Sequence, residues 1–89
     1  EALQLGIVSR VASEDEFPAA AEAPARELAD GPTVALGKAK RLVYTGSEES
    51  LETQLEAERA MISSISGTED ASEGIKAFVE KRTPQFKGR

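Results

Sequence analysis

The stretch Thr68–Arg89, TEDASEGIKAFVEKRTPQFKGR, carries the strongest local signals in this chain. A threonine followed by two acidic residues is typical of a helix start, because the hydroxyl caps free N–H groups and carboxylates favour the positive end of the helix dipole. Thr83-Pro84 is expected to end the helix, since the residue before a proline avoids the α region. The stretch therefore predicts a short amphipathic helix followed by a basic, extended tail.

Three more amphipathic helices are predicted upstream, with short connections between them. Ser13 and Glu16 have the spacing of a capping box, and Asp30-Gly31-Pro32 is a stop signal. Gly46 is expected to cap the C-terminus of the second helix. The predicted helices cover, in order, residues 13–29, residues 32–46, a span from Ser47 or Ser50 to Ser66, and residues 68–83.

Residues 5–11 are short, rich in β-branched residues and partly alternating, and they predict a lead-in strand. A single strand needs a partner for its backbone groups, and no second convincing strand follows. We therefore expect residues 1–12 to be a lead-in strand that belongs to a core outside this chain. Residues 13–89 are expected to form a helical region, so the predicted fold class is mainly α.

Composition excludes several kinds of chemistry. The 89 residues include no cysteine and no histidine, so disulfides, thiolate chemistry, zinc sites and histidine-based triads are excluded, and no metal-binding residue is predicted. A net charge of −5 argues against nonspecific nucleic-acid binding. No apolar run is long enough for a membrane span or a signal sequence. We expect a cytoplasmic protein without a membrane or nucleic-acid partner.

Two charged residues interrupt apolar stripes of the predicted helices. Lys40 falls between Leu36 and Val43, and Glu58 falls within the stripe of the next helix. One interpretation is that both side chains extend past the core to water. The other is a partly buried ion pair, because buried charges need partners. We predict the pair, which joins the second and third helices.

Phe78 and Lys81 are three residues apart on the last predicted helix and share one face. Taken singly, Phe78 has the pattern of a core residue and Lys81 that of a solvated one. Taken together, beside Arg82 and Lys87, they offer a ring and a cation to a phosphorylated nucleotide.

The order and spacing of several short motifs resemble the enoyl-CoA hydratase/isomerase (crotonase) superfamily. The resemblance covers nearly the whole chain, and its most specific part is the segment that opened this section. The matching motifs are Leu5-Gly6-Ile7-Val8 with Val11, Leu28-Ala29-Asp30-Gly31-Pro32 with Ala35 and Lys40, Ser50-Leu51-Glu52 with Gln54-Leu55 and Glu58, and Thr68-Glu69-Asp70 with Glu73-Gly74, Ala77-Phe78, Glu80-Lys81-Arg82, Pro84-Gln85-Phe86 and Gly88.

The resemblance implies a ββα-spiral core followed by a C-terminal helical region, and this chain would be the helical region. In the family the core supplies an oxyanion hole for the thioester enolate and the acid/base carboxylates, while the helical region mediates trimerisation. None of the core motifs is present here, so no catalytic residue is assigned. By similarity, Phe78 and Lys81 match residues that help to bind coenzyme A. The implied partners are acyl-CoA and further subunits, as a trimer or higher oligomer, without a covalently bound cofactor.

Two functions stay open at this point. The first is a C-terminal segment of an enoyl-CoA hydratase/isomerase, where a general hydratase and an isomerase of the phenylacetate-degradation type both fit. The second is a free-standing helical interaction module without enzymatic activity. The unpartnered lead-in strand favours the first.

Overall fold

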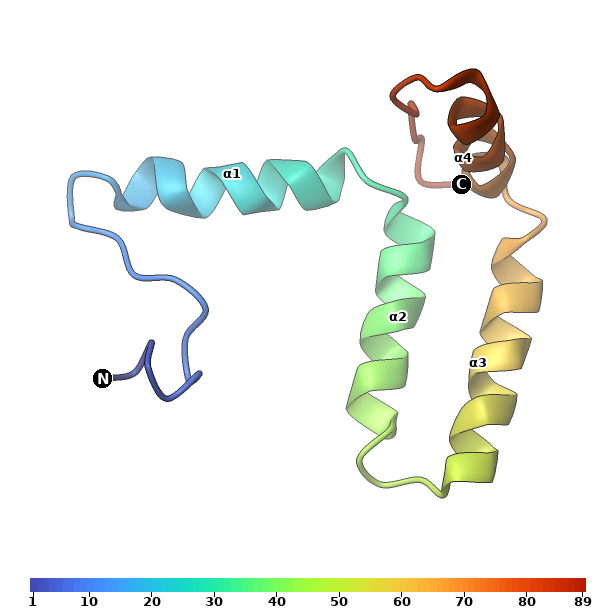
Figure 1. Cartoon of the computed structure of the whole chain (residues 1–89), viewed down its shortest axis with the longest axis horizontal. Helices are drawn as coiled ribbons and strands as arrows, with labels where there is room; N and C mark the ends of the chain where they lie inside the picture. The colour runs from blue at the N-terminus through green and yellow to red at the C-terminus, as the bar shows by residue number, and fades with distance from the viewer.

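The computed structural model describes every residue, 1–89, and contains four α-helices and no strand. The helices follow one another with short connections, as Figure 1 shows. Their bounds are α1 Phe17–Ala29, α2 Thr33–Thr45, α3 Leu51–Ile65 and α4 Glu69–Glu80. The predicted mainly α fold with four helices is confirmed.

The starts of α3 and α4 follow from their capping side chains. The hydroxyl of Ser50 accepts a hydrogen bond from the Thr53 N–H at 3.2 Å, and that of Thr68 accepts one from the Ala71 N–H at 3.1 Å. Each bond satisfies one of the N–H groups that a helix start leaves free. Gly46 ends α2, as predicted. Of the two starts considered for the third helix, Ser50 is the correct one.

The first helix begins at Phe17, later than the predicted start at Ser13. The Glu16 carboxylate accepts from the Ser13 N–H at 3.4 Å, which is half of a capping box. The other half is missing: the Ser13 hydroxyl accepts from no helix N–H group, and it donates to the same carboxylate at 2.7 Å. Without a capping hydroxyl at Ser13, the first regular turn forms further along the chain.

The predicted lead-in strand in residues 1–12 is not formed. Residues 2–6 make turns, with the Leu5 N–H donating to the Glu1 carbonyl at 2.9 Å. The physical reason is that this chain has no second strand to accept the backbone hydrogen bonds of the first. Its apolar residues Val8 and Val11 instead line a shallow hollow with Phe17 at the start of α1.

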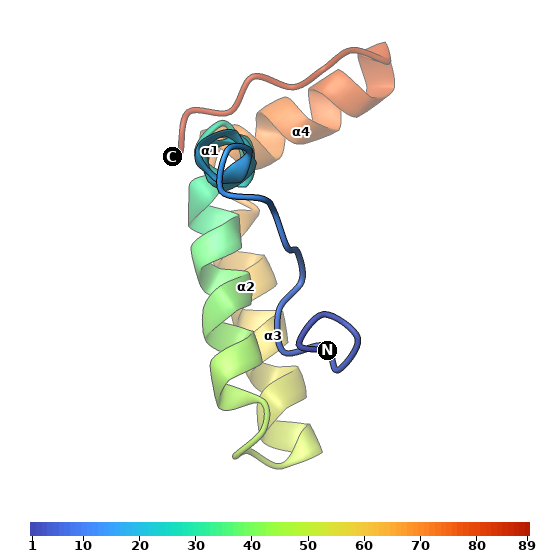
Figure 2. The same ribbon diagram turned by 90° about the vertical axis from the view of Figure 1, so that its left-hand side faces the viewer.

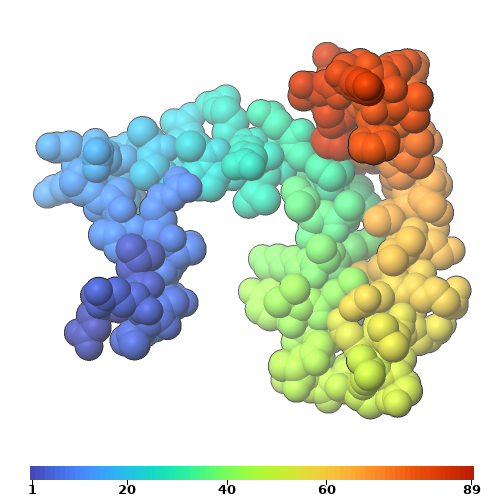
Figure 3. Space-filling model, in the orientation of Figure 1, coloured from blue at the N-terminus to red at the C-terminus, as the bar shows by residue number.

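The helices form an open arrangement. α2 and α3 run antiparallel and side by side, whereas α1 extends away from them (Figures 1 and 2). In the space-filling view, the N-terminal segment and the α2–α3 pair form two arms that α1 joins (Figure 3). The radius of gyration is 16.7 Å, against about 12 Å for a compact domain of this length. The chain therefore leaves much of its surface uncovered.

The contact between α2 and α3 combines polar residues with small and larger apolar ones. Gln54 donates from Nε2 to the Leu42 carbonyl at 3.1 Å, and Lys38 bonds the Ser64 hydroxyl. Most of the partly buried residues of the two helices recur every three or four positions, and they are Val34, Ala35, Lys38 and Leu42 on α2 and Gln54, Ala57, Met61 and Ile65 on α3. This spacing defines one seam along each helix.

Four bulky aliphatic residues, Leu51, Leu55, Ile62 and Ile65, give α3 the apolar stripe that its sequence predicts, and only Ile65 lies in this seam. Leu51, Leu55 and Ile62 are between 54 and 70% exposed, and Ala77 on α4 is the only buried apolar residue of the chain. The total accessible area is 7384 Å², whereas a compact monomer of this mass exposes about 5,000 Å². Most of the apolar stripe of α3 therefore has no cover within this chain.

The predicted ion pair between Lys40 and Glu58 is wrong. Neither residue takes part in any of the six salt bridges of the structure, and both are exposed. Lys40 lies instead over the Tyr44 ring, with its ammonium 5.7 Å from the ring centroid. An exposed charge keeps its hydration and does not require a partner, which is the other interpretation given above.

Candidate functional site

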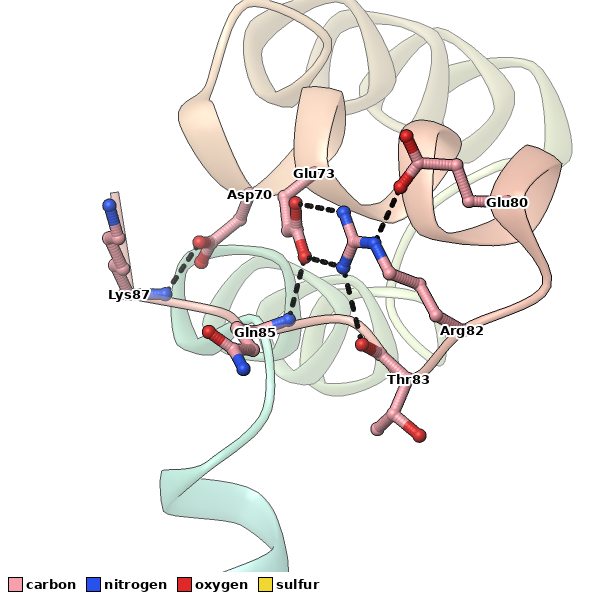
Figure 4. A network of polar contacts seen from close by, with 7 residues as sticks. All are labelled: Asp70, Glu73, Glu80, Arg82, Thr83, Gln85 and Lys87. Carbon is pink, nitrogen blue, oxygen red and sulfur yellow. Dashed lines mark hydrogen bonds and ion pairs between the residues drawn. The ribbon is translucent and has the colours of Figure 1, made fainter.

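The candidate site is the unit formed by α4 and the tail that follows it. The tail, residues 83–89, runs back along α4 toward its N-terminus (Figure 2). Two carboxylates of α4, Asp70 and Glu73, bind the tail, and Figure 4 shows both of them. The predicted basic tail is thus extended, but it is docked on its own helix.

Asp70 holds the end of the tail. Its two carboxylate oxygens accept from the backbone N–H groups of Lys87 at 2.7 Å and Gly88 at 2.8 Å. Its own N–H donates to the Arg89 carbonyl at 2.9 Å. Asp70 is only 4% exposed, and burial of a carboxylate is tolerated when such bonds satisfy it. Asp70 therefore fixes the tail against the first turn of α4.

Gly88 lies where the tail passes the start of α2. Its φ is +72°, a left-handed conformation that favours glycine. A Cβ at this position would lie 2.6 Å from the Thr33 hydroxyl oxygen, which is too close for a van der Waals contact. The tail therefore touches α2 as well as α4, and a side chain does not fit at position 88.

Glu73 holds the start of the tail through Arg82. The Arg82 guanidinium donates to both Glu73 oxygens, at 2.6 and 2.9 Å, and its Nε donates to Glu80 at 2.6 Å (Figure 4). The Gln85 N–H adds a bond of 2.8 Å to Glu73. This fork geometry is the strong form of an arginine–carboxylate pair. We call Glu73, Glu80 and Arg82 the clamp.

The charges in the clamp shift its titrations. The Arg82 guanidinium, with help from the Gln85 N–H, lowers the pKa of Glu73 from 4.5 to about 2. Hydrogen bonds from Arg82 to Glu73 and Glu80 raise the pKa of the guanidinium above its usual value. Because the pKa of Glu73 is lowered, the stability that its ion pair with Arg82 contributes is fully present above pH 4.5. This stability is lost as the pH falls through about 2.

The two residues predicted to contact coenzyme A lie at the end of α4. Phe78 is 85% exposed, with Ile75 and Val79 exposed beside it, so it is not a core residue of this chain. Lys81 is exposed and takes part in no salt bridge. The structure therefore leaves both the ring and the ammonium free to meet a ligand or another surface.

Lys81 also ends the helix, two residues before the predicted stop at Thr83-Pro84. Its φ of +54° and ψ of +40° place it in the left-handed region. Its N–H and that of Arg82 bond back to the carbonyls of Phe78 and Ala77, as in a Schellman motif. The left-handed conformation costs a residue with a Cβ about 1–2 kcal/mol, and glycine usually occupies this position. Lys81 is the only non-glycine residue with a positive φ.

Several parts of this site were not predicted from the sequence. Asp70 was assigned to the helix dipole alone, and the pairing of Glu73 with Arg82 was missed. A spacing of nine residues matches no helical repeat, so periodicity gives no sign of it. The basic residues after a helix end were a usable signal, since they can turn back toward carboxylates at the helix start.

None of the four helices is long and apolar enough to cross a membrane.

Comparison with known proteins identifies the family. The family model for enoyl-CoA hydratase/isomerase matches residues 1–89. A probable enoyl-CoA hydratase of Mycobacterium tuberculosis is 42% identical over 89 residues, covering 100% of this chain and 35% of that protein. A 1,2-epoxyphenylacetyl-CoA isomerase of Escherichia coli is 34% identical over 89 residues, again with 100% of this chain and 34% of the relative.

The fold agrees with this result. A crystal structure of an enoyl-CoA hydratase from Geobacillus kaustophilus matches with a TM-score of 0.91 and 35% identity, over 99% of this chain and 33% of that one. The chain belongs to the enoyl-CoA hydratase/isomerase family, and it spans about a third of the length of the relatives it matches. The resemblance seen in the sequence motifs is confirmed.

Proposed function

We propose that this chain is the C-terminal helical region of a cytoplasmic enoyl-CoA hydratase or isomerase that acts on acyl-CoA thioesters. Family membership over residues 1–89 carries the proposal. In it, the chain supplies part of the coenzyme A site and a surface for subunit association, and the rest of the enzyme supplies the oxyanion hole and the acid/base carboxylates. The enzyme needs no covalently bound cofactor, and of the two reactions we favour that of a lyase, which adds water to an enoyl-CoA.

Phe78 and Lys81 are proposed to contact the nucleotide end of coenzyme A. The exposed ring and the free ammonium at the end of α4 support this assignment. A phosphate is a suitable partner for an ammonium without an internal counterion, and an exposed ring can pack on adenine. The acyl end of the substrate, where the bonds change, lies elsewhere in this proposal.

Lys81→Ala in the complete enzyme tests the assignment. We expect the KM for a CoA thioester to rise about 10-fold, the effect of losing one charge-assisted bond worth about 1.5 kcal/mol. The value of kcat should stay nearly unchanged, because the contact is the same in the ground and transition states. Pantetheine thioesters, which lack the nucleotide, should be unaffected.

Lys76→Ala is the matched control, since Lys76 is another exposed lysine of α4 and should leave both substrates unchanged. Equal weakening of CoA and pantetheine substrates by Lys81→Ala, or no effect on either, would count against the assignment.

Self-association is the second part of the proposal, as a trimer or higher oligomer of the complete enzyme. The exposed stripe of α3, Leu51, Leu55 and Ile62, supports it, because monomers rarely leave large apolar patches in water. Leu51, Leu55 and Ile62 lie outside the seam with α2, so the stripe is available to another surface.

The isolated chain is therefore expected to self-associate in sedimentation experiments over a range of concentrations. Leu55→Lys together with Ile62→Lys should shift it toward monomer, because two buried ammonium groups would oppose any contact through the stripe. Ser63→Lys, on an exposed polar position of the same helix, is the control. A wild-type chain that stays monomeric throughout would contradict the prediction.

A further inference from the structure

The left-handed conformation of Lys81 is held from both sides. Glu80 and Arg82 are its chain neighbours, and their side chains pair with each other at 2.6 Å. The same guanidinium reaches back two turns to grip both oxygens of Glu73. Three residues thus fix the backbone on each side of Lys81, although none of them binds its ammonium. Unfavourable backbone conformations of this kind persist where the surroundings over-determine them, and they are concentrated at functional sites.

The clamp also removes the nearby carboxylates that could pair with the Lys81 ammonium. Glu80 is the preceding residue, and an unpaired carboxylate there would be a close partner for the lysine ammonium. Arg82 occupies this carboxylate and that of Glu73, so Lys81 is left without an internal counterion. A cation in this state attracts an external anion more strongly than one already paired, since it gives up no ion pair on binding.

We infer that Glu73, Glu80 and Arg82 are positioning residues for Lys81: they hold its left-handed turn and keep its ammonium unpaired for a phosphate of the nucleotide. The inference rests on the proposed function of Lys81. It goes further because it assigns the specificity for the phosphorylated substrate to a cluster that does not itself touch the ligand.

The test compares Arg82→Gln with Lys81→Ala in the complete enzyme. Glutamine cannot neutralise Glu73 and Glu80, and we expect the KM for a CoA thioester to rise about 10-fold, as expected for Lys81→Ala. The value of kcat and the kinetics of pantetheine thioesters should stay the same. In the double variant the KM should rise no further than in Lys81→Ala, because both changes remove one contact. Arg82→Lys should raise the KM less than Arg82→Gln does, since lysine keeps the positive charge but lacks the two-pronged guanidinium.

The outcomes separate the two proposals. If Lys81→Ala leaves the CoA kinetics unchanged, the proposed function of Lys81 fails. If Lys81→Ala raises the KM and Arg82→Gln does not, only the positioning inference fails. A fall in kcat, or equal losses with pantetheine substrates, would show a merely structural role and overturn the inference. Should Arg82→Gln fail to fold, Glu80→Gln removes a single bond of the clamp and is expected to raise the KM for CoA alone.

A second measurement shows whether the clamp exists in solution, using the 89-residue chain. The Glu73 carboxyl should titrate with a pKa of about 2 in nuclear magnetic resonance spectra, and Arg82→Gln should raise this pKa toward 4.5. Glu56, which pairs with Arg59 on α3, serves as an internal control and should not respond. A Glu73 pKa near 4.5 in the wild-type chain would overturn the inference.

Discussion

Replacing Asp70 by alanine is expected to release the end of the tail from α4. The change removes both acceptors for the Lys87 and Gly88 N–H groups. A hydrogen bond to a charged group contributes about 1.5–3 kcal/mol, so two of them stabilise the docked tail by about 3 kcal/mol or more. The protection of the Gly88 amide against hydrogen exchange should fall roughly 100-fold, because each 1.4 kcal/mol corresponds to a factor of about ten.

Two companion variants make the result specific. Asp70→Asn keeps one carbonyl acceptor, so it should lose part of the protection. Glu69→Ala is the matched control, because its contacts to Lys87 and Arg89 are exposed and such pairs contribute little. Unchanged Gly88 protection in Asp70→Ala would mean that the tail is not held as the structure shows.

The helix ends show what local chemistry predicts well. Ser50, Thr68 and Gly46 act as caps where their residue types indicate. Two helix ends were misplaced. At Ser13 the hydroxyl donates to a carboxylate and does not cap α1, and α4 ends at Lys81, whose left-handed conformation propensity alone would disfavour.

Faces and long-range contacts were harder to predict. A periodic pattern identifies an apolar stripe on α3, but it does not say whether Leu55 or Gln54 meets the neighbouring helix. The distinction depends on the partner surface, which only the three-dimensional arrangement gives. For the same reason, the sequence indicated Phe78 and Lys81 as a local pair, while the pairing of Glu73 and Glu80 with Arg82 was found only in the structure.

The 89-residue chain by itself is expected to hydrate crotonyl-CoA no faster than buffer. Acid/base catalysis at neutral pH needs a carboxyl group with a pKa tuned toward the working pH. The shifts found here go the other way: Arg82 lowers the pKa of Glu73 to about 2, and hydrogen bonds from Ser13 and Arg59 lower those of Glu16 and Glu56. Such groups are poor bases, and Asp70 is occupied by the backbone of the tail.

Hydratase assays of the purified chain and of a complete enzyme that contains it provide the measurement. Enzymes of this kind accelerate their reactions by at least about 10⁶-fold, so the two preparations should differ by orders of magnitude. Turnover by the chain above the buffer rate would contradict the prediction, and Glu73→Gln and Asp70→Asn would then show whether either carboxylate is responsible. An inactive chain, together with an effect of Lys81→Ala on CoA substrates alone in the complete enzyme, would separate substrate binding from catalysis. This part of the protein would then bind substrate without performing chemistry. A free-standing interaction module would instead be inactive and show no dependence on the nucleotide of CoA.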